Sequence, residues 1–224
     1  PVVLGKKSLS SLPYRYEIYQ YTAEVTTEAG DTQSAQGSIS ADMNPYQIGI
    51  IGVGETLLKD YPQPMRFAVS NKMGIPVKKE VRYEVFELSP LQKGVDRKTG
   101  KCVLSGSVVS NTEFAATDMY RLPSGNYRLK ISVEGEQKEQ TEFTDFSLFS
   151  LSDKSLPSGI DIFLYSTNTE FGEKAPVLYF GTSMKEVDVF CNIYTGKGEI
   201  LVRHFALSDS IRSFSFPYKE LYGE

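Results

Sequence analysis

The sequence predicts an all-β protein built from tandem antiparallel β-sandwich domains of the immunoglobulin-like kind. Three observations lead to this prediction. Tyr and Phe are abundant, with 14 and 13 copies and no Trp, and aromatic residues favour pleated, half-buried surfaces. The segment 127–134 alternates strictly between apolar and polar residues, which is typical of a strand with one buried face. No window of about 12 residues keeps the spacing of an amphipathic helix, so we expect no long helix.

Turn residues divide the middle of the chain into short strands. Polar, glycine-containing turns lie at 71–74, 124–126 and 195–198, at the spacing that a sandwich needs. The expected strands between residues 46 and 150 are 46–53, 64–70, 76–88, 102–110, 113–121, 126–134 and 139–149. Because parallel strands need long crossovers and none is evident, we expect antiparallel pairing. The alternation places Tyr127, Leu129, Ile131 and Val133 in the core of this sandwich.

Two polar stretches, 42–45 and 152–159, indicate domain boundaries because each puts proline and turn-forming residues between apolar strands. We therefore expect three parts. Residues 1–45 would be the closing strands of one domain, 46–152 a complete sandwich, and 153–224 the first strands of a following domain.

An internal repeat supports this division. Tyr21–Asp31 resembles Tyr127–Glu136, and the two segments start 106 residues apart (127 minus 21). At this period the matching hairpin of the last part would fall beyond Glu224, so we expect both end parts to be incomplete and less protected from hydrogen exchange than 64–149. The sequence opens on Pro1 with no leader, and we expect a processed product or a piece of a longer chain.

Composition excludes several classes of protein. The net charge is −4 and the pI is near 5.3, so there is no basic footprint for nucleic acid. No stretch approaches the roughly 18 apolar residues that span a bilayer. A single histidine, His204, excludes zinc sites that need two imidazoles, and two cysteines exclude four-cysteine zinc sites. We expect no catalytic residues, no metal and no cofactor, and hence no hydrolytic activity.

The lone histidine and the two cysteines are interpreted as structural residues. Cys191 alternates in phase with Val187 and Val189, which favours a core position, and Cys102 begins an apolar strand. We expect no disulfide between them because they fall in different parts of the chain. In an oxidising compartment, a disulfide at a sheet edge shared by the two parts is still not excluded. His204 has no carboxylate beside it in the sequence, and a general base needs an orienting partner.

The segment 91–101 is the longest polar insert, and its positive charge makes it the candidate site of this chain. Its four cations are Lys93, Arg97, Lys98 and Lys101, set against one Asp. A solvated surface loop explains the charge. The functional alternative is an exposed loop that a protease or another partner contacts.

Five segments follow one another in an order and at a spacing that resemble a known family. They are Tyr21–Ala35, Phe67–Val77, Leu122–Leu129, Phe146–Phe149 and Ala175–Ser183. Together they resemble the alpha-2-macroglobulin-like proteins of bacteria, in which macroglobulin domains stand in tandem. The first is similar to the closing hairpin of one domain, the next three to the opening, penultimate and exit strands of another, and the last to the start of a third.

The resemblance implies a large secreted or envelope-anchored protein that traps proteases when a bait segment is cut. Many members also carry a thioester formed from Cys-x-Glu-Gln. This sequence departs from that pattern, because Cys102 precedes Val-Leu-Ser, Cys191 precedes Asn-Ile-Tyr, and no long bait insert is evident.

We therefore expect a non-enzymatic scaffold or interaction segment of an alpha-2-macroglobulin-like protein in the periplasm or at the cell surface. Its partners would be other domains of the parent protein and proteases, with no nucleic acid, and with membrane contact only through an anchor outside this chain. The alternative is a surface adhesion or glycan-binding tandem sandwich. Sugar platforms use aromatic faces, so the absence of Trp disfavours it while 14 Tyr leave it open.

Overall fold

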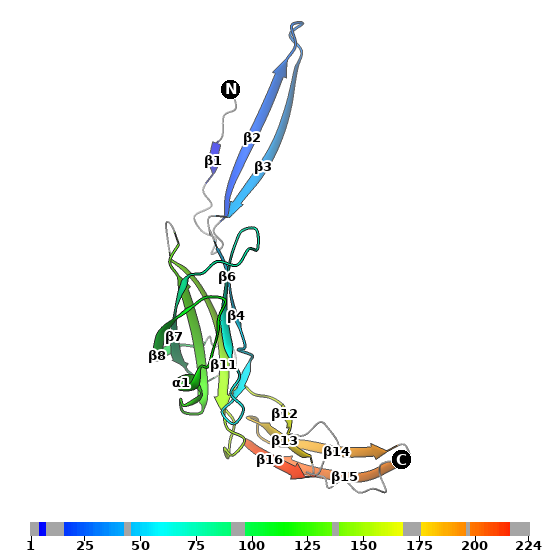
Figure 1. Cartoon of the computed structure of the whole chain (residues 1–224). Helices are drawn as coiled ribbons and strands as arrows, with labels where there is room; N and C mark the ends of the chain where they lie inside the picture. The colour runs from blue at the N-terminus through cyan, green and yellow to red at the C-terminus, as the bar shows by residue number, and fades with distance from the viewer. Residues whose placement is uncertain are drawn as a thin grey trace.

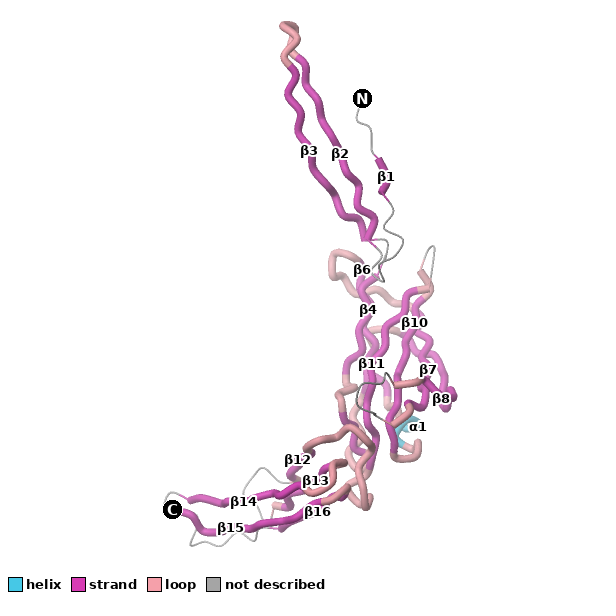
Figure 2. The backbone as a smooth tube through the Cα atoms, turned by 180° about the vertical axis from the view of Figure 1, so that it is seen from behind, coloured by secondary structure: helices cyan, strands magenta, loops and turns pink. Residues whose placement is uncertain are grey.

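The expectation of an all-β fold is confirmed. A computed structural model describes residues 5–7, 16–42, 46–90, 97–135, 139–167, 176–195 and 198–215. In these ranges the regular secondary structure is β-strand, apart from one short helix, α1 (Thr117–Tyr120). Figures 1 and 2 show a β-arm at one end, a sandwich in the middle and a second group of sheets at the other end.

The central unit is a two-layer sandwich. One layer contains, in spatial order, β4 (Tyr46–Ile51), β6 (Met65–Asn71) and β9 (Glu113–Phe114). The other layer contains β5 (Thr56–Leu58), β11 (Gln140–Phe149), β10 (Gly125–Val133), β7 (Glu80–Leu88) and β8 (Thr99–Val109). Each layer turns its apolar residues toward the other, which buries one face of each sheet.

The expected core positions on β10 are confirmed. Tyr127, Leu129, Ile131 and Val133 are between 0 and 3% exposed. They pack against Met65, Phe67 and Val69, which alternate along β6 in the facing layer and are also fully buried. The sequence alternation on the two strands thus forms the two sides of one core.

Two details of the predicted central strands are wrong. The predicted strand 113–121 is a strand only at Glu113–Phe114, after which α1 begins. One helical turn lets the successive residues Met119 and Tyr120 both face the core, which a strand does not allow. The three-residue strand β5 was not expected, and it pairs parallel with the end of β11, so antiparallel pairing is not universal.

A tyrosine fixes the turn that leads into β10. The Tyr127 hydroxyl donates a hydrogen bond to the carbonyl of Pro123, four residues upstream, at 2.8 Å. This is the arrangement of the tyrosine corner of immunoglobulin-like sandwiches. Burial raises the pKa of the Tyr127 phenol above its usual value of 10.0, and the nearby charge of Glu87 adds to the shift.

Replacing Tyr127 with Phe is expected to lower the free energy of unfolding by about 1 kcal/mol at neutral pH, because one hydrogen bond is lost. The folded state holds the phenol proton more tightly than the unfolded state does, so the wild type loses stability as the pH rises above about 10. The variant has no phenol at this position. Urea unfolding at pH 7 to 11 should therefore show the gap between the two proteins narrowing above pH 10, whereas a constant gap would contradict the buried phenol.

A single asparagine ties together the strand ends at one end of the sandwich. Asn111 Oδ1 accepts a hydrogen bond from the Val69 N–H at 3.1 Å, and Nδ2 donates to the carbonyls of Val69 and Val77, both at 2.9 Å. The Asn111 backbone has a φ of 61°, in the left-handed region that Asn tolerates better than most residues. The Asn111 side chain thus supplies hydrogen-bond partners to the main chain at Val69 and Val77, as a neighbouring strand would.

Replacing Asn111 with Ala is expected to cost about 1–3 kcal/mol, because the main-chain N–H of the buried Val69 loses its partner. The carbonyls of Val69 and Val77 keep hydrogen bonds from the Val77 N–H and the Ser110 hydroxyl. Asn111→Gly is the matched control, since it removes the same hydrogen bonds without the penalty that Ala pays at positive φ. Thermal unfolding followed by circular dichroism measures both. A Gly variant as stable as the wild type would show that the side-chain bonds contribute nothing.

The second group of sheets repeats part of the central topology. It consists of a three-stranded sheet in the order β12 (Phe163–Ser166), β13 (Val177–Thr182) and β16 (Ser210–Ser215), and of the hairpin β14 (Val187–Thr195) and β15 (Gly198–Leu207). The first sheet matches β4-β6-β9 in chain order and in its antiparallel pairings, and the hairpin matches β7–β8. We call these five strands the C-terminal unit.

A small core joins the central unit to the C-terminal unit. Phe149 at the end of β11, Leu156, Ile160 and Phe163 at the start of β12 are all buried against one another. The Asp60 carboxylate reinforces this joint, because it accepts hydrogen bonds from the Ser150 hydroxyl at 3.1 Å and the Leu151 N–H at 2.7 Å. The polar stretch 152–159 therefore lies across a packed contact between the two units.

The N-terminal arm projects from the rest of the protein (Figures 1 and 2). It is the hairpin of β2 (Tyr16–Thr26) and β3 (Thr32–Asp42), with β1 (Gly5–Lys7) paired to β2. The residues described from Gln20 to Ser38 are exposed, apart from a half-buried Gly37. The Tyr21 ring lies over Gly37, where any Cβ would collide with it. The division into 1–45, 46–152 and 153–224 as domains stays a prediction.

Candidate interaction surfaces

The histidine does have a carboxylate partner, and the interpretation of His204 as unaccompanied is wrong. His204 on β15 lies directly opposite Phe190 on β14, and its ring stacks on the Phe190 ring with centroids 4.7 Å apart. Its Nε2 lies 2.7 Å from Oδ1 of Asp188. The imidazole and carboxylate side chains are 52% and 62% exposed on an open strand surface. The pair is exposed to water, and Asp188 also lines the groove described below.

Both cysteines are free and half-buried. Cys102 on β8 is oriented by a contact from its Sγ to the carbonyl of Leu104 at 3.4 Å. Cys191 on β14 faces a groove that is described below. Within the described ranges, no group of three or more His, Cys, Asp or Glu side chains is arranged to hold a metal ion.

The structure separates the cations of the predicted partner loop. Lys93 lies outside the described residues. Lys98 and Lys101 are both exposed, but the predicted loop 91–101 is wrong at its end, because Lys101 lies within β8 and of the two only Lys98 precedes the strand. Arg97 is half-buried and donates a hydrogen bond from a terminal nitrogen to the carbonyl of Ser158 at 3.2 Å, so it braces the joint between the two units. Whether a protease or another partner contacts this loop stays a prediction.

Limited trypsin digestion should distinguish these cations. We expect an early cut after Lys98, because its side chain is exposed just before β8 begins, and slower cutting after Lys101 within β8 and after Arg97 and Arg128. Arg128 is the internal control, since its guanidinium is held by Asp145 at 2.7 Å within the central sheet. Mass spectrometry of the first fragments identifies the sites. Equal early cutting after Arg97 and Lys98 would contradict the role of Arg97 in the joint.

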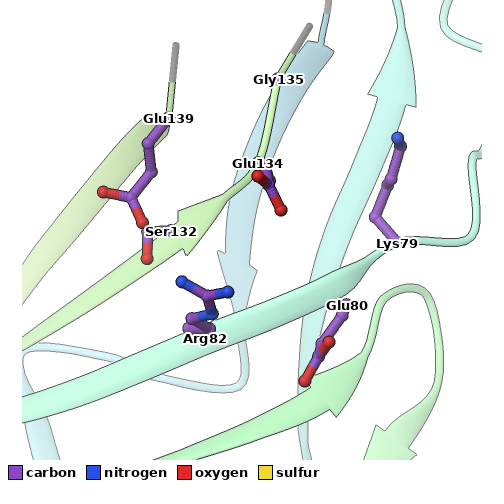
Figure 3. Close-up of a pocket in the computed structure, with 7 residues that line it drawn as sticks. All are labelled: Lys79, Glu80, Arg82, Ser132, Glu134, Gly135 and Glu139. Carbon is purple, nitrogen blue, oxygen red and sulfur yellow. The ribbon is translucent and has the colours of Figure 1, made fainter.

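A polar hollow of about 320 Å³ lies at the end of the central sheet near the β10–β11 turn (Figure 3). Its lining residues are Lys79, Glu80, Arg82, Ser132, Glu134, Gly135 and Glu139. Figure 3 shows the Arg82 guanidinium extending toward the side of the hollow that carries Ser132 and Glu134. Arg82, Glu134 and Glu139 are exposed, so water competes for each charge and the hollow presents no built binding site.

A mainly apolar groove of about 490 Å³ lies in the C-terminal unit. One wall comes from β12 and β13, with Leu164 and Phe180, and the other from β14, with Val189 and Cys191. Leu164 is 66% exposed, which is unusual for a large apolar side chain beside a groove of this size. Sequence reasoning missed this surface, because the strands read as ordinary core strands and their pattern does not show which neighbour is absent.

Comparisons with known proteins add little to this description. No family model matches the chain, and no curated protein matches it. Among solved structures, the chain is similar to alpha-2-macroglobulin from E. coli in its native conformation, with a TM-score of 0.33 and 7% sequence identity. The match covers 92% of this chain and 15% of that chain. A likeness of this strength carries no functional argument, so the fold rests on the sheets and their order.

Proposed function

We propose that this chain is a non-enzymatic scaffold and interaction segment of an alpha-2-macroglobulin-like protein. The observation that carries the proposal is the packed joint. Phe149 and Phe163 meet edge to face at 5.0 Å, and Tyr61 lies 5.2 Å from Tyr165 across the same contact. A joint with its own core holds two β-units in one orientation, as a scaffold requires, whereas an unpacked linker lets them move independently.

Three further features support the proposal. The C-terminal unit repeats the order of five strands of the central unit, as tandem domains do. The motifs described above occur in the order of macroglobulin domains. The titratable pair His204–Asp188 lies on an open surface, so the chemistry of an active site is not favoured there. In this proposal the protein works outside the cytoplasm, with other domains of a parent protein and proteases as partners. Across the described residues, no helix has the length and apolar character to cross a membrane.

The proposal is tested by measuring rigidity and activity together. NMR relaxation of backbone amides should give one rotational correlation time for residues 65–149 and 177–195, because the joint makes the two units tumble as one body. Peptide, ester and glycoside substrates should show no turnover. Two distinct correlation times would overturn the scaffold role, and turnover abolished by a single substitution would show that the chain is an enzyme.

A further inference from the structure

Strand β8 forms one edge of the five-stranded sheet in the central unit. Its ladder with β7 is regular from the pair Glu80–Val109 to the pair Val85–Leu104. Among the residues that the structure describes, no strand pairs with the other side of β8. Figures 1 and 2 both show β8 on the outer side of the sandwich, and the C-terminal unit extends away from that side. The edge of β8 is therefore accessible to another molecule.

The main chain of β8 presents hydrogen-bonding groups to this open side at alternate residues. The Ser110 N–H donates to the Lys79 carbonyl at 2.8 Å, so the main chain of Ser110 points toward the β7 side. The direction alternates along an antiparallel ladder, so the main-chain groups of Ser105, Ser107 and Val109 point away from β7. All three residues are exposed, Val109 by 52%. Their N–H and carbonyl groups can pair with a further strand.

This edge lacks the features that usually prevent pairing between sheets. Natural edge strands carry a charge, a proline or a bulge that blocks a second sheet. The segment 103–109 reads Val-Leu-Ser-Gly-Ser-Val-Val, with no charge and no proline. The irregularity of the β7–β8 ladder lies between Leu104 and Cys102, and the charge of Lys101 lies beyond it. The regular part of the edge is thus open to pairing along its length.

The sequence of the edge has the same character in both directions about Gly106. Ser105 and Ser107 flank this glycine, and Leu104 and Val108 flank the two serines. An antiparallel partner with the identical sequence, related by a two-fold axis at Gly106, therefore sets Ser opposite Ser and an apolar residue opposite an apolar one. Cross-strand pairs of both kinds stabilise a sheet. The edge is complementary to itself.

The inner side chains of β8 are incompletely buried. Leu104 and Val108 pack on the core of the sandwich, yet both are only half-buried. Their partners on β7, Val85 and Val81, are 0% exposed, because β7 has a strand on each side. A strand beside β8 would cover the open sides of Leu104 and Val108.

We propose that two copies of this chain associate through β8, in antiparallel pairing about a two-fold axis at Gly106. The N–H and carbonyl of Ser105 in each copy bond to the carbonyl and N–H of Ser107 in the other. The two five-stranded sheets then form one continuous sheet. The second copy is the partner that this edge fits, because its own β8 supplies the matching order of residues. This association does not depend on the proposed scaffold role.

Sedimentation equilibrium of the whole chain tests the association. The mass should rise with concentration from 25.0 kDa toward twice that value and no further, since a two-fold contact closes on itself. The double variant Ser105→Lys/Ser107→Lys sets Lys opposite Lys at both pairs, and it should stay at 25.0 kDa. Both serine side chains are exposed, so the variant should fold, which far-UV circular dichroism checks.

A matched control adds the same charge elsewhere on the same sheet. Thr56 on β5 and Thr141 on β11 are exposed and lie on the side of the sheet away from β8. The double variant Thr56→Lys/Thr141→Lys should therefore associate like the wild type.

Charge exchange is the decisive experiment. The variant Ser105→Glu/Ser107→Glu should be monomeric alone, like the double Lys variant, because Glu then lies opposite Glu. An equimolar mixture of the two variants sets Lys opposite Glu, so it should form one-to-one pairs. Amide hydrogen exchange locates the contact in the wild type. Exchange at Ser105 and Ser107 should slow several-fold as the concentration rises, while Ser110, already bonded to Lys79, should not change.

Four results would overturn the proposal. They are a wild-type mass of 25.0 kDa at every concentration up to about 1 mM, association that survives the double Lys variant, a mixture that stays monomeric, and exchange at Ser107 that is independent of concentration. The first would also leave the edge to a strand of a different protein.

Discussion

Replacing Phe149 with Ala is expected to lower the free energy of unfolding by about 3–5 kcal/mol, the usual cost of deleting a fully buried aromatic ring. Phe149 is 0% exposed and packs edge to face on Phe163 at 5.0 Å. Leu156 and Ile160 complete the small core of the joint. Because these residues come from both units and from the stretch between them, the cavity left by Ala would weaken the joint before it weakens either sandwich.

Phe143→Ala is the matched control, since it removes the same side chain from the same strand. The Phe143 ring is 58% exposed and its main contact is the Arg128 guanidinium, 4.7 Å from its centroid. An exposed cation–π contact contributes about 0.5–1 kcal/mol. Urea unfolding followed by circular dichroism compares the two variants. Equal losses would show that Phe149 does not hold the joint.

Amide hydrogen exchange shows which part of the structure Phe149→Ala destabilises. The Ser183 N–H donates to the Ile160 carbonyl at 2.8 Å, and the Gly159 N–H donates to the Ser183 hydroxyl at 3.1 Å, both beside the joint. Their protection should fall strongly in Phe149→Ala and stay unchanged in Phe143→Ala. A uniform loss across the central sheet would instead indicate global destabilisation.

The alternation of apolar and polar residues predicted the buried side chains correctly wherever one strand face is buried and the other is exposed to water. It placed Tyr127, Leu129, Ile131 and Val133 correctly because β10 lies in the middle of a sheet whose other layer is apolar. The same rule failed at 113–121, where one helical turn buries the adjacent residues Met119 and Tyr120. Three-residue strands such as β5 are too short to show any period.

Contacts between distant segments could not be predicted, because they depend on register. The approach of His204 to Asp188 follows from the pairing of His204 with Phe190, which sets Asp188 diagonally across the ladder. A shift of one residue would have turned the imidazole to the other face. Arg97 likewise reads as a loop cation, and only the folded joint brings it to the carbonyl of Ser158.

The groove beside β14 illustrates the same limit in another way. Val187, Val189 and Cys191 read as a core strand, and they are one, but only half of their core is present in the described structure. The location of the groove and the open edge that borders it required the sheet order.

The register of the central sheet is tested by two neighbouring substitutions. Leu129→Ala is expected to lower the free energy of unfolding by about 2–5 kcal/mol, because the Leu129 side chain is 1% exposed and its loss leaves a cavity. Lys130→Ala should cost about 1 kcal/mol or less. The Lys130 ammonium pairs with Glu84 at 3.1 Å, and both side chains are more than a third exposed, so water screens the pair.

Adjacent residues on one strand point to opposite faces of the sheet. Leu129→Ala and Lys130→Ala therefore compare the stability contributed by the buried face and by the exposed face of β10 at neighbouring positions. Glu84→Ala and the double variant Lys130→Ala/Glu84→Ala complete a cycle with Lys130→Ala, and the coupling energy should be small, as it is for exposed pairs. The four variants are compared by urea unfolding at pH 7. A larger loss for Lys130→Ala than for Leu129→Ala would mean that the register is wrong by one residue. In that case Val85, which lies opposite Leu129 on β7, would face solvent as well.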